Sequence, residues 1–165
     1  MPGYADKIIS RPDLLRQAAA WRAAGETIAL VNGCFDILHA GHIRFLQAAA
    51  ATAGRLVVAV NSDASVRCLK GEGRPILPEQ ARAQLVAAVR GVDAVTVFEE
   101  STVEPLLRAL RPNVHAKGTD YTETSVPEAG VARELGIAVR IVGDPKSHST
   151  SALLQRLRRF GDTEG

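Results

Sequence analysis

Two histidines three residues apart are the side chains best suited to chemistry in this chain. His39 and His42, with Gly41 between them, follow a glycine-containing turn and lead into a run with helical spacing. At such a strand-to-helix turn, unpaired backbone N–H groups and the positive end of the helix dipole favour an anion. Imidazole N–H groups placed there could hold a phosphate oxygen and neutralise charge that develops on it. The pair therefore indicates phosphate chemistry.

Two other interpretations of this histidine pair stay open on the sequence. Cys34, His39 and His42 could bind a metal ion, although their spacing matches no common zinc pattern and no fourth ligand is evident. The histidines could also cap the helix without any chemistry. Neither the dinucleotide motif G-x-G-x-x-G nor the P-loop G-x-x-x-x-G-K-[ST] occurs, so the usual nucleotide fingerprints give no support.

The elements that must position these residues alternate between strands and helices. Apolar runs predict strands over residues 28–31, 55–60, 94–98, 113–116 and 137–142. Capping residues and helical spacing predict helices over residues 10–24, 42–54, 79–90, 103–110, 127–135 and 149–159. Because parallel strands need crossover helices, the pattern predicts an α/β fold with a parallel sheet covered by helices on both faces.

Polar segments follow the predicted strands, where ligands bind in open parallel sheets. Residues 32–42, 61–63, 70–74, 117–121 and 146–150 all lie there, and three of the four lysines among the 20 basic residues fall in these segments. Residues 70–78 hold two glycines and two prolines, which predicts an irregular loop. Its Lys70 and Arg74 could clamp phosphates, or could be ordinary surface charges.

The last predicted helix opens on three hydroxyl residues. Ser149, Thr150 and Ser151, with Lys146 just before them, suggest a second anion-binding helix N-terminus, although an ordinary cap needs only one hydroxyl. We expect His115 and His148 to be structural.

Length and composition limit the class of protein. With 165 residues, 46% of them hydrophobic and 23% charged, the chain is expected to form a single domain, in which residues 1–26 supply an N-terminal helix and residues 27–160 the core. A net charge of +2 gives no reason to expect a nucleic-acid partner. Two distant cysteines favour a reducing compartment, and no apolar stretch predicts a leader or a membrane span, so we expect a cytoplasmic protein with a small substrate.

Six segments, in this order, carry a family resemblance: G-C-F-D-I-L-H-A-G-H, V-A-V-N-S-D-A-S, L-K-G-E-G-R-P, E-Q-A-R, K-G-T-D-Y and S-T-S. The sequence resembles the cytidylyltransferase-like nucleotidyltransferase superfamily, most closely its heptose 1-phosphate adenylyltransferase group. The resemblance implies a Rossmann-like three-layer sandwich with a five-stranded parallel sheet, of the H-x-G-H nucleotidyltransferase type. It implies a Mg²⁺-dependent attack by a sugar phosphate on the α-phosphorus of ATP, which gives ADP-heptose for lipopolysaccharide and releases pyrophosphate. It also implies a homodimer.

The resemblance assigns roles residue by residue. Catalytic roles fall on His39, His42, Lys70 and Arg82. Nucleotide-binding roles fall on Asn32, Gly33, Cys34, Phe35, Asp36, Gly41, Lys117, Gly118, Asp120, Ser149 and Thr150, and substrate-binding roles on Asn61, Asp63 and Arg74. No residue is assigned as a metal ligand, because Mg²⁺ would arrive with ATP. Close relatives in the superfamily join CTP to glycerol 3-phosphate or ATP to FMN, and a nucleotide-binding regulator without turnover is the non-enzyme alternative.

Overall fold

The computed structural model describes residues 3–145 and 149–161. The first half contains η1 (Tyr4–Lys7), α1 (Arg11–Ala23), β1 (Ile28–Gly33), α2 (Ala40–Ala50), β2 (Arg55–Asn61), α3 (Asp63–Lys70) and α4 (Glu79–Ala87). The second half contains β3 (Ala94–Phe98), α5 (Glu104–Leu110), β4 (Val114–Lys117), α6 (Ala129–Leu135), β5 (Ala138–Ile141) and α7 (Thr150–Gly161).

The strands form one parallel five-stranded sheet in the order β3-β2-β1-β4-β5. The first strand is therefore the central one: Leu30 pairs with Val57 of β2 on one side and with His115 of β4 on the other. From β1 the chain first adds β2 and β3 on one side and then returns to add β4 and β5 on the other side. Open parallel sheets bind ligands at the position where the strand order changes direction in this way. The predicted fold class is confirmed.

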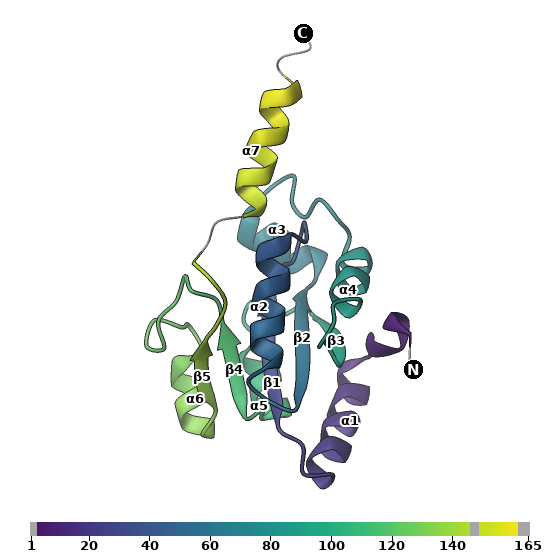
Figure 1. The fold of residues 1–165 in the computed structure, drawn as a ribbon, viewed down its shortest axis with the longest axis vertical. Helices are drawn as coiled ribbons and strands as arrows, with labels where there is room; N and C mark the ends of the chain where they lie inside the picture. Colours follow the sequence, from purple (N-terminus) through teal and green to yellow (C-terminus); the bar gives the residue numbers. More distant parts are fainter. Residues whose placement is uncertain (1–2, 146–148, 162–165) are drawn as a thin grey trace.

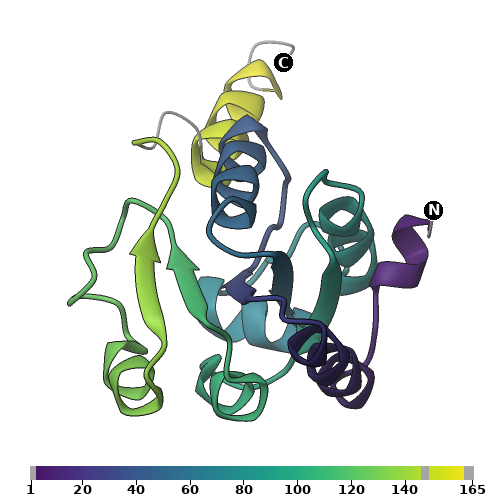
Figure 2. The same ribbon diagram turned by 60° about the horizontal axis from the view of Figure 1, so that its bottom comes forward.

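Helices cover both faces of the sheet because the side chains of the strands alternate between them (Figure 1). On one face, Ala29 and Val31 of β1 pack in a buried cluster with α2 and α4. On the other face, Ile28 and Leu30 pack with α1, α5 and α6. Figure 2 shows these three helices side by side along one side of the sheet. The result is a three-layer sandwich, as the resemblance implied.

Some boundaries differ from the prediction. β1 continues two residues beyond Val31, because Asn32 and Gly33 still pair in register with Ala59 and Val60 of β2. α4 ends at Ala87, three residues before the predicted end at residue 90. The extension of β1 matters for the site, since it makes Asn32 and Gly33 part of the rigid sheet and not of a turn.

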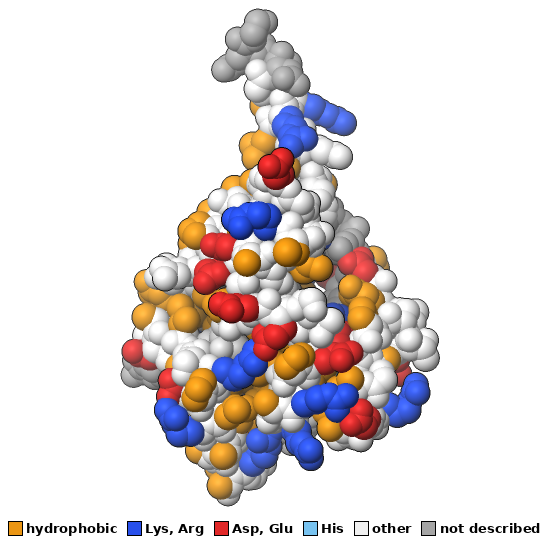
Figure 3. Space-filling view, turned by 180° about the vertical axis from the view of Figure 1, so that it is seen from behind, with side chains coloured by type: hydrophobic (Ala, Val, Ile, Leu, Met, Phe, Trp, Pro, Cys, Tyr) orange, Lys and Arg blue, Asp and Glu red, His pale blue; other side chains and the backbone are white. Residues whose placement is uncertain are grey.

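α7 projects from the end of the molecule where the strands terminate (Figure 1). None of its residues is buried, and Leu157 is 62% exposed. On the back of the molecule, basic and acidic side chains are interspersed, with no continuous patch of one sign (Figure 3). Within the described ranges, no helix has both the length and the apolar character needed to cross a membrane.

Candidate active site

A cavity of about 510 Å³ lies at the carboxyl ends of β1, β4 and β5, where the N-termini of α2 and α7 also meet. Most of the residues predicted from the sequence line it. These are Asn32, Gly33, Cys34, Phe35, Asp36, His39, Gly41, His42, Lys70, Arg74, Lys117, Gly118, Asp120, Ser149 and Thr150. Lys146 and His148 lie outside the described residues.

The resemblance gave no individual binding or catalytic role to the other lining residues: Arg44, Phe45, Leu69, Thr119, Tyr121, Val142, Gly143, Asp144, Pro145 and Ser151. Of these, Thr119, Tyr121 and Ser151 lie in or next to the predicted candidate segments. The sequence positions of some of these residues could have indicated that they lie at the site. Arg44 and Phe45 occupy the next positions along α2, so the predicted helix would have brought them near the histidines. Asp144 follows the last strand, where the loop rule also applies.

His39 and His42 are fixed at the start of α2 by hydrogen bonds to the backbone. His39 is the N-cap, and its Nδ1 accepts from the N–H of Gly41 at 3.1 Å. Nδ1 of His42 accepts from the N–H of His39 at 3.3 Å, and the two rings stack with centroids 3.9 Å apart. Because each Nδ1 is an acceptor, the ring proton of each neutral imidazole lies on Nε2. Both histidines thus take part in capping α2, and both rings line the cavity.

The structure does not group Cys34, His39 and His42 as metal ligands. The part of the chain that the structure describes contains no group of three or more His, Cys, Asp or Glu side chains placed to hold a metal ion. Burial raises the pKa of the Cys34 thiol, although Lys70, Arg82 and Arg74 act in the opposite direction. A thiol with a raised pKa is a poor metal ligand, since the thiolate is the binding form.

Phe35 links the end of β1 to the histidines. Its backbone is in the left-handed region, with φ of 48°, and its ring meets that of His42 edge-on at 5.5 Å. A Cβ at Gly33 would approach the Phe35 ring to 3.1 Å, so the absence of a side chain at Gly33 lets the ring lie against the strand. A left-handed residue costs about 1 kcal/mol and is found where surrounding packing holds it. Here it positions His42.

Asp36 organises the loop after α3. Its carboxylate is buried and accepts from Nε of Arg74 at 2.7 Å and from the N–H groups of Ile76 and Leu77 at 2.9 and 3.0 Å. Burial raises the pKa of Asp36, but the hydrogen bonds from Leu77, Ile76 and Arg74 outweigh it and hold the pKa below its ordinary value. Asp36 thus stays ionised and holds Arg74 at the cavity.

Arg82 does not reach the cavity, contrary to its predicted catalytic role. Its side chain is fully buried and donates to the carbonyls of Leu77, Cys34 and Asn61 at 2.7–2.9 Å, and to Oδ1 of Asp63 at 2.8 Å. All of its bonding partners are therefore parts of the protein. The guanidinium joins the turn after β1, the end of β2, the start of α3 and the loop before α4.

Asn61 and Asp63 do not line the cavity either, although substrate-binding roles were predicted for them. Nδ2 of Asn61 donates to Oγ of Ser65 at 2.9 Å, and Asp63 pairs with Arg82. Both side chains stabilise the start of α3. Of the three residues assigned to substrate binding, the structure brings only Arg74 to the cavity.

His115, expected to be structural, is fully buried in β4 and holds the Asn32 side chain at the edge of the cavity. Its Nε2 lies 3.0 Å from Oδ1 of Asn32, an acceptor, so the ring donates from Nε2. Burial, together with the positive charge of Lys117, lowers the pKa of His115 to about 3. The ring is therefore neutral, and its donation orients Asn32 in the sheet.

Contacts at the entrance tie α2 to the loops after β4 and β5. Nε of Arg44 pairs with Asp144 at 2.9 Å, and Oγ1 of Thr119 donates to the carbonyl of Asp144 at 3.0 Å. The Oγ of Ser149 accepts from the N–H of Ala152 at 3.1 Å, which caps α7. The predicted cap is confirmed, and Thr150 at the start of α7 lines the cavity.

Basic side chains at the cavity are mostly paired with carboxylates. Arg74 pairs with Asp36, Arg44 with Asp144 and Lys117 with Glu128, whereas Lys70 has no ion pair within the described ranges. The first and last of these carboxylates are buried and the Asp144 side chain is 65% exposed. An entering anion thus meets cations that are already ordered.

Three carboxylates line the cavity: Asp36, Asp120 and Asp144. The oxygens of Asp36 and Asp144 are engaged by arginines, and Asp120 is the third carboxylate on the lining. Mg²⁺ in nucleotide enzymes is commonly held by one or two carboxylates together with phosphates and water. The described part of the chain contains no preformed metal centre, so a metal ion would have to enter with its own ligands.

Comparison with known proteins is consistent across sequence and structure. The family model described as Cytidylyltransferase-like matches residues 30–156. The chain is 44% identical over 153 residues to the bifunctional protein HldE of Methylobacillus flagellatus, and 46% identical over 150 residues to that of Koribacter versatilis. These alignments cover 93% and 91% of this chain but 31% of each relative, so the chain spans about a third of their length.

The fold is also similar to a crystal structure of the lipopolysaccharide core biosynthesis protein from Thermoplasma volcanium. The TM-score is 0.62 at 28% identity, over 75% of this chain and 100% of that chain.

Replacing Arg82 tests its supporting role. Arg82→Met removes the fully buried guanidinium that donates to three carbonyls and to Asp63, so we expect the free energy of unfolding to fall by about 3 kcal/mol or more in urea titrations. Arg67→Met, which removes an exposed arginine from α3, is the matched control and should change it by less than about 0.5 kcal/mol. Equal stabilities for the two variants would contradict the role of Arg82.

The lowered pKa of His115 predicts a specific pH dependence of stability. Between pH 6.5 and about 3 the unfolded chain binds a proton at His115 and the folded protein does not, so the free energy of unfolding falls as the pH falls. The slope is about 1.4 kcal/mol per pH unit. His115→Gln keeps a donor near Asn32 and lacks this titration, so urea titrations from pH 7.5 to 5 should show a shallower decline. Parallel declines would refute the assignment.

Proposed function

This chain belongs to the cytidylyltransferase-like family, and we propose from this premise that it transfers AMP from ATP to D-glycero-D-manno-heptose 1-phosphate. The products would be ADP-heptose, for lipopolysaccharide core biosynthesis, and pyrophosphate. The observation that carries the proposal is the pair of stacked imidazoles at the N-terminus of α2, in each of which Nδ1 accepts from a backbone N–H and leaves Nε2 to donate. The relatives named HldE and the lipopolysaccharide core biosynthesis protein support the choice of sugar.

In the proposed reaction, an oxygen of the sugar phosphate forms a bond to the α-phosphorus of ATP while the bond to the β-phosphate oxygen breaks. Negative charge spreads over the non-bridging oxygens in the transition state. The Nε2–H groups of His39 and His42 would donate to these oxygens, and the first backbone N–H groups of α2 add their positive dipole. Gly41 has no side chain between the helix N-terminus and the phosphate.

The remaining cavity residues would bind and neutralise the substrates. Lys70 and Arg74 come from α3 and the following loop, and Ser149 and Thr150 come from the start of α7. They could hold the triphosphate from two sides, which fixes the reacting groups in line. Mg²⁺ bound to the triphosphate would supply further charge neutralisation.

A panel of substrates tests the reaction. Pyrophosphate release is measured with ATP or CTP, each combined with heptose 1-phosphate, glycerol 3-phosphate or FMN. We expect turnover with ATP and heptose 1-phosphate, and at least a hundredfold lower kcat/KM with the other pairs, because a polar site rejects analogues that leave its groups unpaired. Preference for another pair would reassign the substrates. Nucleotide binding without turnover in any pair would favour a regulator.

The histidines can be separated from their capping role. His39→Ala and His42→Ala should each lower kcat by about a hundredfold, the effect of losing one transition-state donor. His39→Asn is the sharper variant, because asparagine is a good N-cap and keeps α2 intact while removing the imidazole N–H. We expect the same loss of kcat with an unchanged melting temperature. Near-normal turnover in His39→Asn would mean that His39 only caps the helix.

A further inference from the structure

The carboxylate of Glu128 is buried beside the cavity without an evident structural task. Its side chain is 6% exposed and makes no capping hydrogen bond to α6, which it precedes. Oε2 has no hydrogen-bond partner among the described residues. A buried carboxylate is costly unless a cation compensates its charge, and a small polar residue would cap α6 better. A neighbouring cation must therefore compensate the charge of Glu128.

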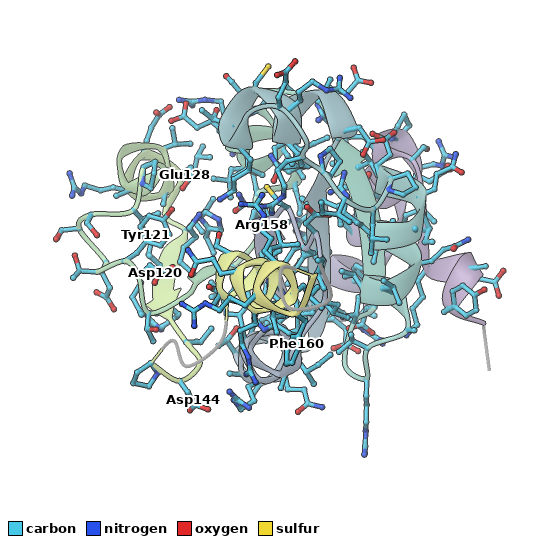
Figure 4. All side chains as sticks on the ribbon, turned by 90° about the horizontal axis from the view of Figure 1, so that it is seen from above. Asp120, Tyr121, Glu128, Asp144, Arg158 and Phe160 are labelled. Atoms are coloured by element: carbon cyan, nitrogen blue, oxygen red, sulfur yellow. The ribbon has the colours of Figure 1, made fainter. Side chains whose placement is uncertain are left out.

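That neighbour is Lys117, the last residue of β4. Its side chain is 9% exposed, and Nζ lies 3.7 Å from Oε2 of Glu128 and 4.8 Å from the centroid of the Tyr121 ring. Glu128 and Tyr121 lie on the same side of α7 in the view from above (Figure 4). The ammonium is thus held by a carboxylate and a ring face together.

The pair leaves the hydrogen-bonding capacity of Lys117 in place. At 3.7 Å the contact with Glu128 is an ion pair and is too long for a hydrogen bond. Lys117 lines the cavity, whereas Glu128 does not. Lys70, by contrast, is exposed at the end of α3 and must lose side-chain entropy to hold an anion. Lys117 has already been ordered, so its binding to an anion costs less.

We propose that Glu128 is a positioning residue, which, with Tyr121, fixes Lys117 as a binding site for a phosphate group of one substrate. The inference rests on the proposed function, in which both substrates carry phosphate. Because Glu128 does not line the cavity and acts only by holding Lys117, its loss should weaken substrate binding and leave the chemical step nearly intact. Electrostatic attraction by Lys117 remains in a Glu128 variant, but its ammonium is no longer held at one place.

The test compares Glu128→Gln, Lys117→Met and the double variant with Glu123→Gln, which neutralises an exposed carboxylate in the same loop. We expect KM to rise about tenfold for either ATP or heptose 1-phosphate in Glu128→Gln, the lower end of what partners that orient a ligand contribute. The substrate whose KM rises identifies the phosphate, and kcat should stay within about threefold. Glu123→Gln should match the parent protein.

The double variant decides between positioning and general stability. If Glu128 acts through Lys117, removing it from Lys117→Met should raise KM no further. Additive effects, or a lower melting temperature in Glu128→Gln with both KM values unchanged, would overturn the proposal.

Calorimetric titration with inorganic pyrophosphate and with ATP keeps this inference separate from the reaction. Weaker binding in both Glu128→Gln and Lys117→Met, in a protein that turns over no substrate pair, would refute the proposed function and support the positioning role. Turnover of the proposed substrate pair, with unchanged affinity for ATP and pyrophosphate in Glu128→Gln, would support the proposed function and refute the positioning role.

Discussion

The buried guanidinium of Arg82 is the interaction on which the site most depends. It joins three carbonyls and one carboxylate that belong to the turn after β1, the end of β2, the start of α3 and the loop before α4. Asp36 completes the frame by holding the backbone of that loop. Without these bonds, the segments that carry Cys34 and Arg74 would have no fixed relation to the start of α2, because loops alone are held weakly.

Three of the basic side chains that line the cavity are held in ion pairs. Arg74 and Lys117 are each held by a buried carboxylate, and Arg44 by an exposed one. Such pairing lowers the net charge of the empty cavity and keeps its cations in place, which is the condition for electrostatic preorganisation. The pair between Arg44 and Asp144 is more exposed than the other two, and surface ion pairs contribute little to stability. The cavity thus combines buried and exposed ion pairs.

Much of this organisation could be predicted from the chain alone. Apolar runs and capping residues predicted five parallel strands and the helices between them, and the rule that ligands bind at the carboxyl ends of strands collected most of the lining residues. The prediction succeeded because these features depend on local spacing. It placed Arg82, Asn61 and Asp63 in the site because a motif records residue type and order but not which way a side chain points.

By itself, the sequence determined the sheet, the position of the histidines at a helix start and the resemblance to nucleotidyltransferases. Only the tertiary structure decided the direction of each side chain. In the structure, the Arg82 side chain points into the protein and donates to the carbonyl of Cys34, and His115 contacts Asn32. Glu128, which follows the loop after β4, forms an ion pair with Lys117 at the end of β4. These contacts join residues distant in sequence, and their geometry follows from how buried charges and polar groups find partners once the helices have packed. No local pattern encodes that choice.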